Sequence, residues 1–496
     1  MYLTFDIGTS SVKAALVGAD GRASRVERAP VGLYRGDGDS AWEAEPSEWW
    51  HALAECSRRL VTDAPGQIRA VAVSGNGPTL VPADKRGKPV GRAISWMDRR
   101  ARDQADRISA LMGFPLDPSF YLPKVLWFRE NRPEEFERTS RFFSCPEWIA
   151  FRLSGEACTY LTDPYYERYT WGGNTASDLG LDASRFPPYT APGRILGGVL
   201  PDASRDTGIP EGTPVVSAFP DFLASLLGSG AVEPGIACDR AGTSEAFNVC
   251  APAPCADWSF LSLPHAVPGL WNISGGLSTS GKALEWYARA AGFPPDDESG
   301  ARKVFRAAES SVPGAGNLLF LPFLAGERAP LWRRDLRGAF LGLSVDHGPE
   351  DLARAVAESI GFGLRLTSQG LADRGHLTSL VRVSGRPARN TFLSRLKADI
   401  LGLPVEVPEL PDCELLGNAA ACAVALGDGA SLAEAAARLV RVESRFEPEP
   451  GTRQEYDRLF GIFADAVESL IPLSERLTSD SKTTGGYQSR LGNNQP

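Results

Sequence analysis

Residues 6–11 constrain the fold more than any other part of the chain. They read Asp-Ile-Gly-Thr-Ser-Ser and lie between two strand-like runs, residues 2–5 and 14–17. The glycine lets the backbone approach an anion, and the hydroxyl and N–H groups of the turn can point at phosphate. A carboxylate that ends the first strand can face the hydration shell of Mg²⁺. Taken alone, an ordinary hairpin turn explains the segment equally well.

The same pattern occurs a second time, about half a chain later. Residues 239–244 read Asp-Arg-Ala-Gly-Thr-Ser and again separate two strand-like runs, residues 235–238 and 246–249. A phosphate turn that occurs once in each half indicates two similar domains that grip one nucleotide. The predicted phosphate contacts are Gly8, Thr9, Ser10 and Ser11 in the first copy and Gly242, Thr243 and Ser244 in the second.

The length of the chain also favours two domains. Its 496 residues exceed what one hydrophobic core normally holds, and the hydrophobic content of 43% is ample for two cores. We expect an N-terminal domain over residues 1–229 and a C-terminal domain over residues 230–473. Residues 474–496 lose all periodicity and are expected to form a disordered tail.

Charge and cysteine usage exclude several classes of protein. The net charge is −9 and no long basic run is present, which argues against nucleic-acid and anionic-membrane partners. The chain opens on a strand pattern and contains no 18-residue apolar stretch, so we expect a cytoplasmic protein. The eight cysteines form no Cys-x-x-Cys pair, and we expect them to be reduced, buried side chains.

Asp221 is the leading candidate for a catalytic acid–base group. It follows a predicted strand over residues 213–219, at the edge where open α/β sheets place their chemistry, and it precedes a helical pattern over residues 222–228. A helix N-cap is the simpler interpretation of such an aspartate. The two roles are compatible, because a helix N-terminus stabilises the ionised carboxylate that a general base needs.

Three further segments of the second half carry polar residues next to predicted strands or helices. The strand 380–384 ends in Ser384 and Gly385, which suit either an adenosine or α-phosphate contact or a simple strand-to-helix turn. Glu327 and Arg328 follow a buried strand and are interpreted as an ion pair that fixes a loop. The small-residue helix that begins near residue 416 suits tight packing against a ligand or a sheet.

Taken together, the ordered motifs resemble those of the FGGY carbohydrate kinases, from Asp6 to about residue 430. The segments that carry the resemblance are residues 6–11, 42–50, 96–101, 123–127, Asp221, 242–244, 321–330, 338–343 and 397–405. Any one of these matches alone is weak, but so many in the same order make a chance resemblance improbable.

The resemblance implies an α/β fold of two actin-like, ribonuclease H-like domains with a catalytic cleft between them. It implies transfer of the ATP γ-phosphoryl group to a carbohydrate hydroxyl, with Mg²⁺ as cofactor. Asp221 matches the general base and, with Asp6, the carboxylates near the metal, while Lys13 would neutralise charge on the phosphoryl group. The C-terminal domain would bind the nucleotide, with Ser384, Gly385 and Arg389 at the adenosine side.

The acceptor is less well defined, because the chain departs from the family patterns at several pocket positions. Residues 76–79 match neither the xylulose-type nor the glycerol-type segment, and Phe222 replaces the amide residue that usually follows the base. The predicted substrate contacts are Asn76, Gly77, Trp96, Asp98, Asp221 and Phe222. Trp96 also suits a core position, and Asp98 also suits a partner of Arg100 or a helix cap.

Two other functions stay open at this point: an actin-like ATPase without a small acceptor, and a catalytically silent sugar sensor. The favoured hypothesis is a sugar kinase whose acceptor is a ketose such as a pentulose, a polyol or a sugar acid. Its expected partner is that small molecule, and a homodimer is one oligomeric state that the sequence leaves open.

Overall fold

The computed structural model describes residues 1–38, 40–64, 66–172, 175–293 and 299–479. Their contacts divide the chain into two compact units. Unit 1 comprises Met1–Val232, Pro264–Leu270 and Asp412–Arg441, and unit 2 comprises the described residues of Glu233–Leu263, Trp271–Pro411 and Val442–Pro496. Unit 2 therefore differs from the predicted C-terminal domain, which was continuous over residues 230–473, because residues 412–441 pack with unit 1. The predicted boundary at residue 229 stays a prediction.

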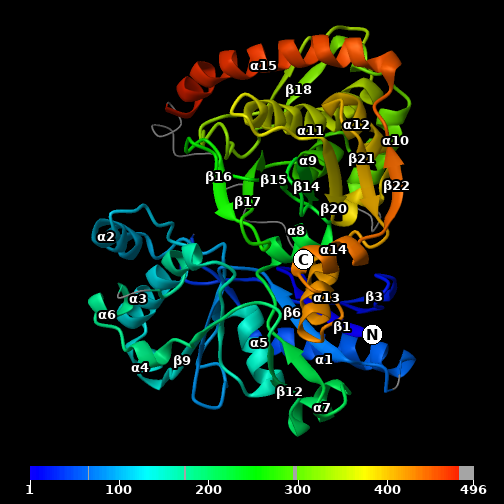
Figure 1. The fold of residues 1–496 in the computed structure, drawn as a ribbon. Coiled ribbons are helices and arrows are strands. Elements are labelled where there is room, and N and C mark those ends of the chain that lie inside the picture. The colour runs from blue at the N-terminus through cyan, green and yellow to red at the C-terminus, as the bar shows by residue number, and fades with distance from the viewer. Residues whose placement is uncertain (39, 65, 173–174, 294–298, 480–496) are drawn as a thin grey trace. The chain divides into compact units, whose positions relative to one another are not determined.

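A six-stranded sheet forms the centre of unit 1, in the order β12-β13-β6-β1-β2-β3 (Figure 1). The strands are β1 (Tyr2–Ile7), β2 (Ser11–Val17), β3 (Ala23–Pro30), β6 (Ala70–Gly75), β12 (Ile195–Gly198) and β13 (Pro214–Val216). β1 pairs antiparallel with β2 and parallel with β6, which in turn pairs parallel with β13. Every residue of β1 is buried, as expected for a central strand covered on both faces.

The central sheet of unit 2 repeats this plan, in the order β22-β21-β20-β14-β15-β17-β16. The strands are β14 (Ile236–Ala241), β15 (Glu245–Ala251), β16 (Leu261–Pro264), β17 (Trp271–Leu277), β20 (Leu380–Ser384), β21 (Val405–Pro408) and β22 (Val442–Phe446). β14 pairs antiparallel with β15 and parallel with β20, which pairs parallel with β21. The two sheets thus share one topology around their two turn hairpins, and the predicted duplication is confirmed.

Small residues bring two helices of unit 1 into close contact. These helices are α8 (Asp221–Gly228) and α13 (Cys413–Ala425), and α13 also packs on β1 and β6. A Cβ atom added to Gly417 would lie 2.0 Å from the Ala224 carbonyl oxygen, and one added to Gly228 would lie 1.7 Å from the Cys413 carbonyl oxygen. The small-residue helix predicted near residue 416 therefore packs against both a sheet and the helix that begins at Asp221.

Unit 1 also contains a five-stranded sheet, in the order β4-β5-β8-β7-β9. Its strands are β4 (Tyr34–Arg35), β5 (Trp42–Ala44), β7 (Leu80–Ala83), β8 (Ala93–Ile94) and β9 (Arg141–Ser144). The other elements of unit 1 are α1 (Pro46–Asp63), α2 (Arg102–Met112), α3 (Tyr121–Asn131), α4 (Pro133–Arg138), α5 (Cys145–Ser154), β10 (Thr159–Tyr160), η1 (Pro164–Tyr169), α6 (Thr175–Asp178), η2 (Ala183–Arg185), β11 (Tyr189–Thr190), α7 (Pro201–Thr207) and α14 (Leu432–Leu439).

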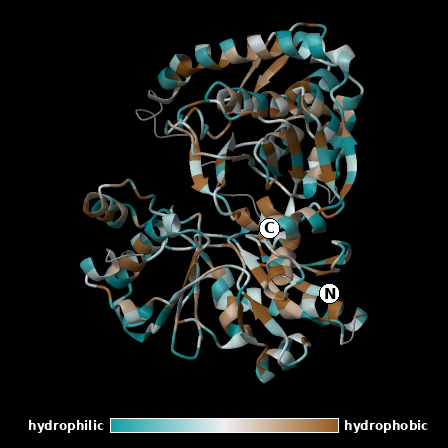
Figure 2. Ribbon diagram, viewed as in Figure 1, coloured by the Kyte–Doolittle hydropathy of each residue, from teal (hydrophilic) through white to brown (hydrophobic). Residues whose placement is uncertain are grey.

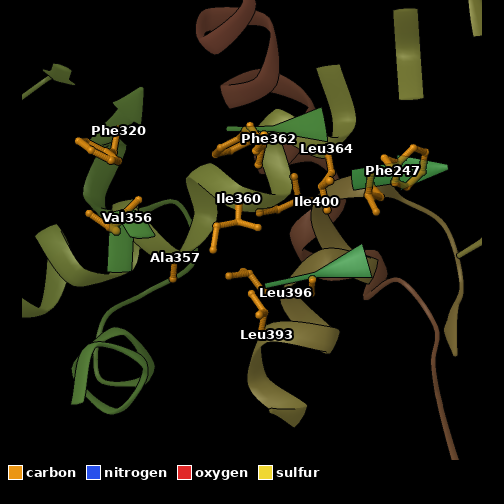
Figure 3. Close-up of a cluster of buried hydrophobic side chains, with 14 of the residues drawn as sticks. Phe247, Phe320, Val356, Ala357, Ile360, Phe362, Leu364, Leu393, Leu396 and Ile400 are labelled. Atoms are coloured by element: carbon orange, nitrogen blue, oxygen red, sulfur yellow. The ribbon is translucent and has the colours of Figure 1, made fainter. Parts of the chain in front are cut away.

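The core of unit 2 lies between its sheet and two helices, α11 (Pro349–Ala372) and α12 (Thr391–Leu401). Figure 3 shows Ile360 and Phe362 of α11 together with Leu396 and Ile400 of α12 in one buried cluster. Figure 2 shows hydrophobic residues along the strands of both central sheets. The remaining elements of unit 2 are α9 (Gly281–Ala290), α10 (Ser299–Glu309), η3 (Ala315–Asn317), β18 (Leu319–Leu321), β19 (Ala339–Leu341), η4 (Arg386–Arg389) and α15 (Pro450–Ser479).

Three whole-chain expectations meet the structure as follows. Residues 474–479, predicted to begin a disordered tail, form the end of α15, and residues 480–496 lie outside the described part. All eight cysteines are free and buried, as predicted. Within the described residues, none of the helices combines the length and the apolar character that a membrane span requires.

Candidate active site

The carboxyl ends of three adjacent strands bring two aspartates to one edge of the unit 1 sheet. Asp6 lies opposite Ser74 in the parallel β1–β6 pair. One residue further along β6, Gly75 bridges in parallel to Pro220, the residue before Asp221. Because β1, β6 and β13 run parallel, Asp6 and Asp221 lie near the same sheet edge.

Asp6 is 3% exposed and has two polar neighbours. The Ser74 hydroxyl donates to its Oδ1 atom over 3.0 Å, and Lys13 Nζ lies 3.3 Å from its Oδ2 atom. Burial raises the pKa of Asp6, Lys13 counteracts that rise, and the negative charge of Asp221 adds to it. Asp221 is thus close enough to Asp6 for its charge to act on that carboxylate.

Lys13 belongs to a cluster of ions in unit 1. Its Nζ atom lies 3.3 Å from Asp6, 3.5 Å from Asp412 and 3.7 Å from Glu414, and Arg28 pairs with Asp412 as well. Burial disfavours the charged ammonium, but Glu414, Asp6 and Asp412 outweigh it, so the pKa of Lys13 is raised. Lys13 therefore stays charged and is held among carboxylates.

The first turn has the tight geometry that its sequence predicts. The Gly8 N–H donates to the Ser11 carbonyl oxygen over 3.0 Å, and a Cβ atom on Gly8 would lie 2.9 Å from that oxygen. The Trp96 indole N–H donates to the Thr9 hydroxyl over 3.0 Å. The Ser10 carbonyl accepts from the Val31 N–H. The turn is thus fixed from both sides.

Asn76 stabilises this turn through hydrogen bonds of its side chain. Its side-chain amide donates to the Ile7 carbonyl over 2.9 Å, and its oxygen accepts from the Thr79 hydroxyl at 2.5 Å. Thr79 in turn accepts from the Trp96 backbone N–H. Three predicted site residues, Asn76, Trp96 and Thr9, are therefore joined in one hydrogen-bonded chain. Asn76 is 7% exposed, so most of its side chain serves this chain of bonds.

Asp98 has a different environment from that expected of a sugar ligand. It is fully buried, and its Oδ2 atom accepts from the Trp42 N–H and from the Arg100 guanidinium, at 2.8 and 2.7 Å. Its Oδ1 atom accepts from the Arg100 backbone N–H. This geometry favours the alternative that the sequence left open, in which Asp98 holds Arg100.

Phe222 and Gly77 lie beside aromatic residues that the sequence did not single out. The Phe222 ring centroid is 6.4 Å from that of Tyr166, whose hydroxyl donates to the Pro264 carbonyl over 2.6 Å. A Cβ atom on Gly77 would lie 3.4 Å from the Tyr121 hydroxyl.

Asp221 is the first residue of α8, after the N-cap residue Pro220, and its Oδ1 atom accepts from the Phe222 N–H at 2.7 Å.

The second turn, in unit 2, is clamped by the start of α9. The Gly281 N–H donates to the Gly242 carbonyl, and the N–H groups of Ser280 and Lys282 donate to the Thr243 carbonyl, over 3.1 to 3.2 Å. Gly385 approaches from the other side, at a φ of +87°, where an added Cβ atom would lie 2.2 Å from the Ala241 carbonyl oxygen.

The structure therefore brings Ser384 and Gly385 to the base of the second turn. Ser384 lies opposite Arg240 in the parallel β14–β20 pair, and Gly385 follows it directly. Ser244 completes the turn, before Glu245 begins β15. Arg389 lies at the exposed end of η4, four residues beyond Gly385.

The described residues contain no cluster of three or more His, Cys, Asp or Glu side chains arranged to hold a metal ion. Two neighbouring carboxylates nevertheless suit Mg²⁺, which keeps several water ligands and commonly binds one or two carboxylates together with substrate phosphates. The observation that supports this fit is that Asp6 and Asp221 follow neighbouring parallel strands to the same sheet edge.

Comparison with known proteins accounts for this arrangement. A family model described as the FGGY family of carbohydrate kinases, N-terminal domain, matches residues 1–228, and the model of the C-terminal domain of the same family matches residues 240–426. The chain belongs to the FGGY family of carbohydrate kinases. It has the two-domain actin-like fold, and it is a phosphotransferase with an alcohol group as acceptor and ATP as the family's phosphate donor.

Relatives of this FGGY kinase differ in their named substrates. It is 26% identical to the xylulose kinase of Staphylococcus epidermidis over 501 residues, covering 97% of this chain and 99% of the relative. It is 27% identical to the gluconokinase of Bacillus subtilis over 522 residues, covering 99% and 98%. The crystal structure of xylulose kinase from Rhodospirillum rubrum matches with a TM-score of 0.80 at 25% identity, covering 96% and 99%.

Several residues at the site were missed by sequence reasoning. Ser74 and Asn418 both support the β1 edge, because Asn418 donates to the Phe5 carbonyl and to the Ser74 hydroxyl at 2.8 Å. Asp412 and Glu414 reach Lys13 from a segment about 400 residues away. A buried asparagine within a helix of small residues was a signal for Asn418, because a buried amide needs partners.

Proposed function

We propose that this kinase transfers the γ-phosphoryl group of ATP to a hydroxyl of a small sugar, polyol or sugar acid, with Asp221 as general base. The observation that carries the proposal is the placement of Asp221 and Asp6 at one edge of the unit 1 sheet, where their charges interact. Phosphoryl transfer needs mainly positioning and charge neutralisation, so one base, one metal-binding carboxylate and two phosphate turns are sufficient.

Each side chain in unit 1 then has a distinct task. Asp221 accepts the proton of the attacking hydroxyl, and its position at the first residue of α8 favours its ionised form. Asp6 and Asp221 would hold Mg²⁺, which when bound neutralises charge on the transferring phosphoryl group. Lys13, held among three carboxylates, opposes the rise in the pKa of Asp6 that burial and Asp221 cause.

The phosphate contacts are proposed to come from both units. In unit 1 the N–H and hydroxyl groups of Thr9 and Ser10 would meet the γ-phosphate, since the hairpin fixes their backbone. In unit 2 Gly242 and Thr243 would meet the β- and γ-phosphates, and Ser384 and Gly385 the adenosine side. Clamping of the second turn by α9 supports this role, because a rigid turn binds an anion at a smaller entropic cost.

The acceptor is proposed to lie against Trp96 and Phe222. The indole of Trp96 is anchored to the first turn through Thr9, so its ring would lie close to the γ-phosphate that this turn is proposed to bind. Phe222, packed against Tyr166, replaces a hydrogen-bonding group by an apolar wall. The relatives are named for xylulose, a ketose, and gluconate, a sugar acid, so the proposed acceptors include ketoses and sugar acids.

The test is a substrate panel with a coupled readout of ADP formation. Ketoses, alditols and aldonates are each incubated with the full chain, ATP and Mg²⁺. The proposal expects ADP release that depends on one group of acceptors and that is slow without any of them. ADP release at the same rate with and without every sugar would instead indicate an actin-like ATPase, and binding of a sugar without any turnover would indicate a sugar sensor.

A further inference from the structure

Three ionisable side chains form a fully buried cluster beneath the second phosphate turn. Lys397 of α12 pairs with Asp239 of β14, at 2.6 Å, and with Glu245, the first residue of β15. All three side chains are 0% exposed. Asp239 and Glu245 lie on the two strands that the turn connects, so one ammonium group ties both sides of the hairpin together.

The cluster also reaches the clamp on the other side of the turn. The Ser280 hydroxyl donates to Glu245, although Ser280 is the N-cap residue of α9 and makes no side-chain cap bond to its own helix. The backbone of Ser280 donates to the Thr243 carbonyl. Lys397, Glu245, Ser280 and Thr243 thus form one continuous path of contacts.

The charges of the cluster are balanced by Lys397. Burial disfavours its charged form, but Asp239 and Glu245 outweigh that effect and raise the pKa of Lys397 to about 12. Burial and the charge of Glu245 raise the pKa of Asp239, and Lys397 opposes that rise. Without Lys397, two acids would stay buried without the cation that compensates them, which would destabilise the hairpin that carries them.

We propose that Lys397 is a positioning residue for the phosphate part of the nucleotide: through Glu245 and Ser280 it fixes the Gly242–Thr243 turn in its binding geometry. This inference rests on the proposed function, in which that turn binds the β- and γ-phosphates. Lys397 is fully buried, so it would act on a bound nucleotide only through these neighbouring side chains. Because Lys397 acts through Glu245 and Ser280, we expect its effect to be larger on the phosphates than on the adenosine side.

The experiment compares binding of MgATP and AMP to the full chain by calorimetry, which does not require the acceptor to be known. Lys397→Met is expected to weaken ATP binding at least tenfold while changing AMP binding less than twofold. Ser280→Ala keeps the three ions intact and is expected to weaken ATP binding a few fold, while lowering the melting temperature less than Lys397→Met does. It keeps the inference testable if the Lys397 variant fails to fold.

A matched control is available in the same unit. Arg354 and Glu358 of α11 form another buried ion pair, whose hydrogen bonds run to Tyr456 and to the backbone of Gly314. Arg354→Met is expected to lower the melting temperature as Lys397→Met does, but to leave the ratio of ATP to AMP affinity unchanged.

The outcomes separate the two levels of the proposal. A wild-type protein that prefers ATP over AMP, combined with Lys397→Met and Ser280→Ala variants that keep this preference, would overturn the inference alone. A wild-type protein that binds ATP no more tightly than AMP would overturn the proposed role of the turn, and the inference with it. A loss of the preference in Arg354→Met equal to that in Lys397→Met would also overturn the inference, because the effect would then be general destabilisation.

Discussion

The indole N–H of Trp96 donates a hydrogen bond to the Thr9 hydroxyl over 3.0 Å. This bond joins a residue proposed to contact the acceptor to a residue proposed to contact the γ-phosphate. It therefore offers a direct way to ask whether the two substrates are positioned together.

A double-mutant cycle on this pair tests that connection. Trp96→Phe keeps an aromatic face but removes the donor, and Thr9→Val removes the acceptor. We expect the two changes to be non-additive in kcat/KM for the sugar, with a coupling of about 1 kcal/mol, or about fivefold. Additive effects would show that the bond does not contribute to catalysis.

Replacing Lys13 should change the pH dependence of turnover. Lys13 lowers the pKa of Asp6, whereas burial and Asp221 raise it. Without the ammonium the pKa of Asp6 rises further, so a higher pH is needed to ionise it. In Lys13→Met the acidic limb of the kcat/KM profile should move to higher pH by about 1 to 3 units. The exposed Lys85 provides the control, since Lys85→Met should leave the limb in place. An unchanged limb in Lys13→Met would contradict the proposed role of Lys13.

Asp98→Asn distinguishes the two roles that the sequence allowed for Asp98. The structure places its carboxylate in a buried pair with Arg100. The variant should therefore lose about 3 to 5 kcal/mol of stability in urea unfolding. In protein that remains folded, KM for the acceptor should change little. A stable Asp98→Asn variant with a strongly raised KM would instead identify Asp98 as a sugar ligand.

The close crossing of α8 and α13 should be sensitive to a single methyl group. A Cβ atom at Gly417 would overlap the Ala224 carbonyl, so Gly417→Ala should cost about 1 to 3 kcal/mol. Because α8 begins at Asp221, kcat should fall as well. Gly461→Ala in α15 is the matched control: no atom lies within 4 Å of its added Cβ, and the change should be neutral or stabilising by up to about 1 kcal/mol. Equal stabilities of the two variants, measured by thermal unfolding, would contradict the packing argument.

Local sequence patterns predicted the elements that carry the site, since the two turns lie between strands that match the predicted runs. Asp221 also follows its predicted strand. Local patterns could not predict which segments far apart in the sequence contact each other. The apolar helix pattern of residues 413–425 predicts that this helix packs against another part of the protein. It does not predict that its packing partner belongs to unit 1. The ion pairs of Lys13 with Asp412 and Glu414 could not be predicted either, because these residues lie about 400 positions apart in the sequence.

Lys397 is a case in which the sequence carried an unused signal. It lies on the helical face formed by Leu393, Leu396 and Ile400, all of which are buried. A lysine on an apolar face of a helix predicts a buried acidic partner, because an unpaired buried ammonium is too costly. The identity of that partner required the structure, since Asp239 and Glu245 lie about 150 residues earlier.

The central claim is that Asp221 removes the proton of the carbohydrate hydroxyl, and the most direct measurement is the kcat of Asp221→Asn alongside its affinity for ATP. The amide keeps the shape of the side chain but cannot act as a base. We predict that kcat falls by about 10² to 10⁴-fold and that the affinity for ATP is nearly unchanged. A variant that keeps the wild-type kcat would contradict the assignment.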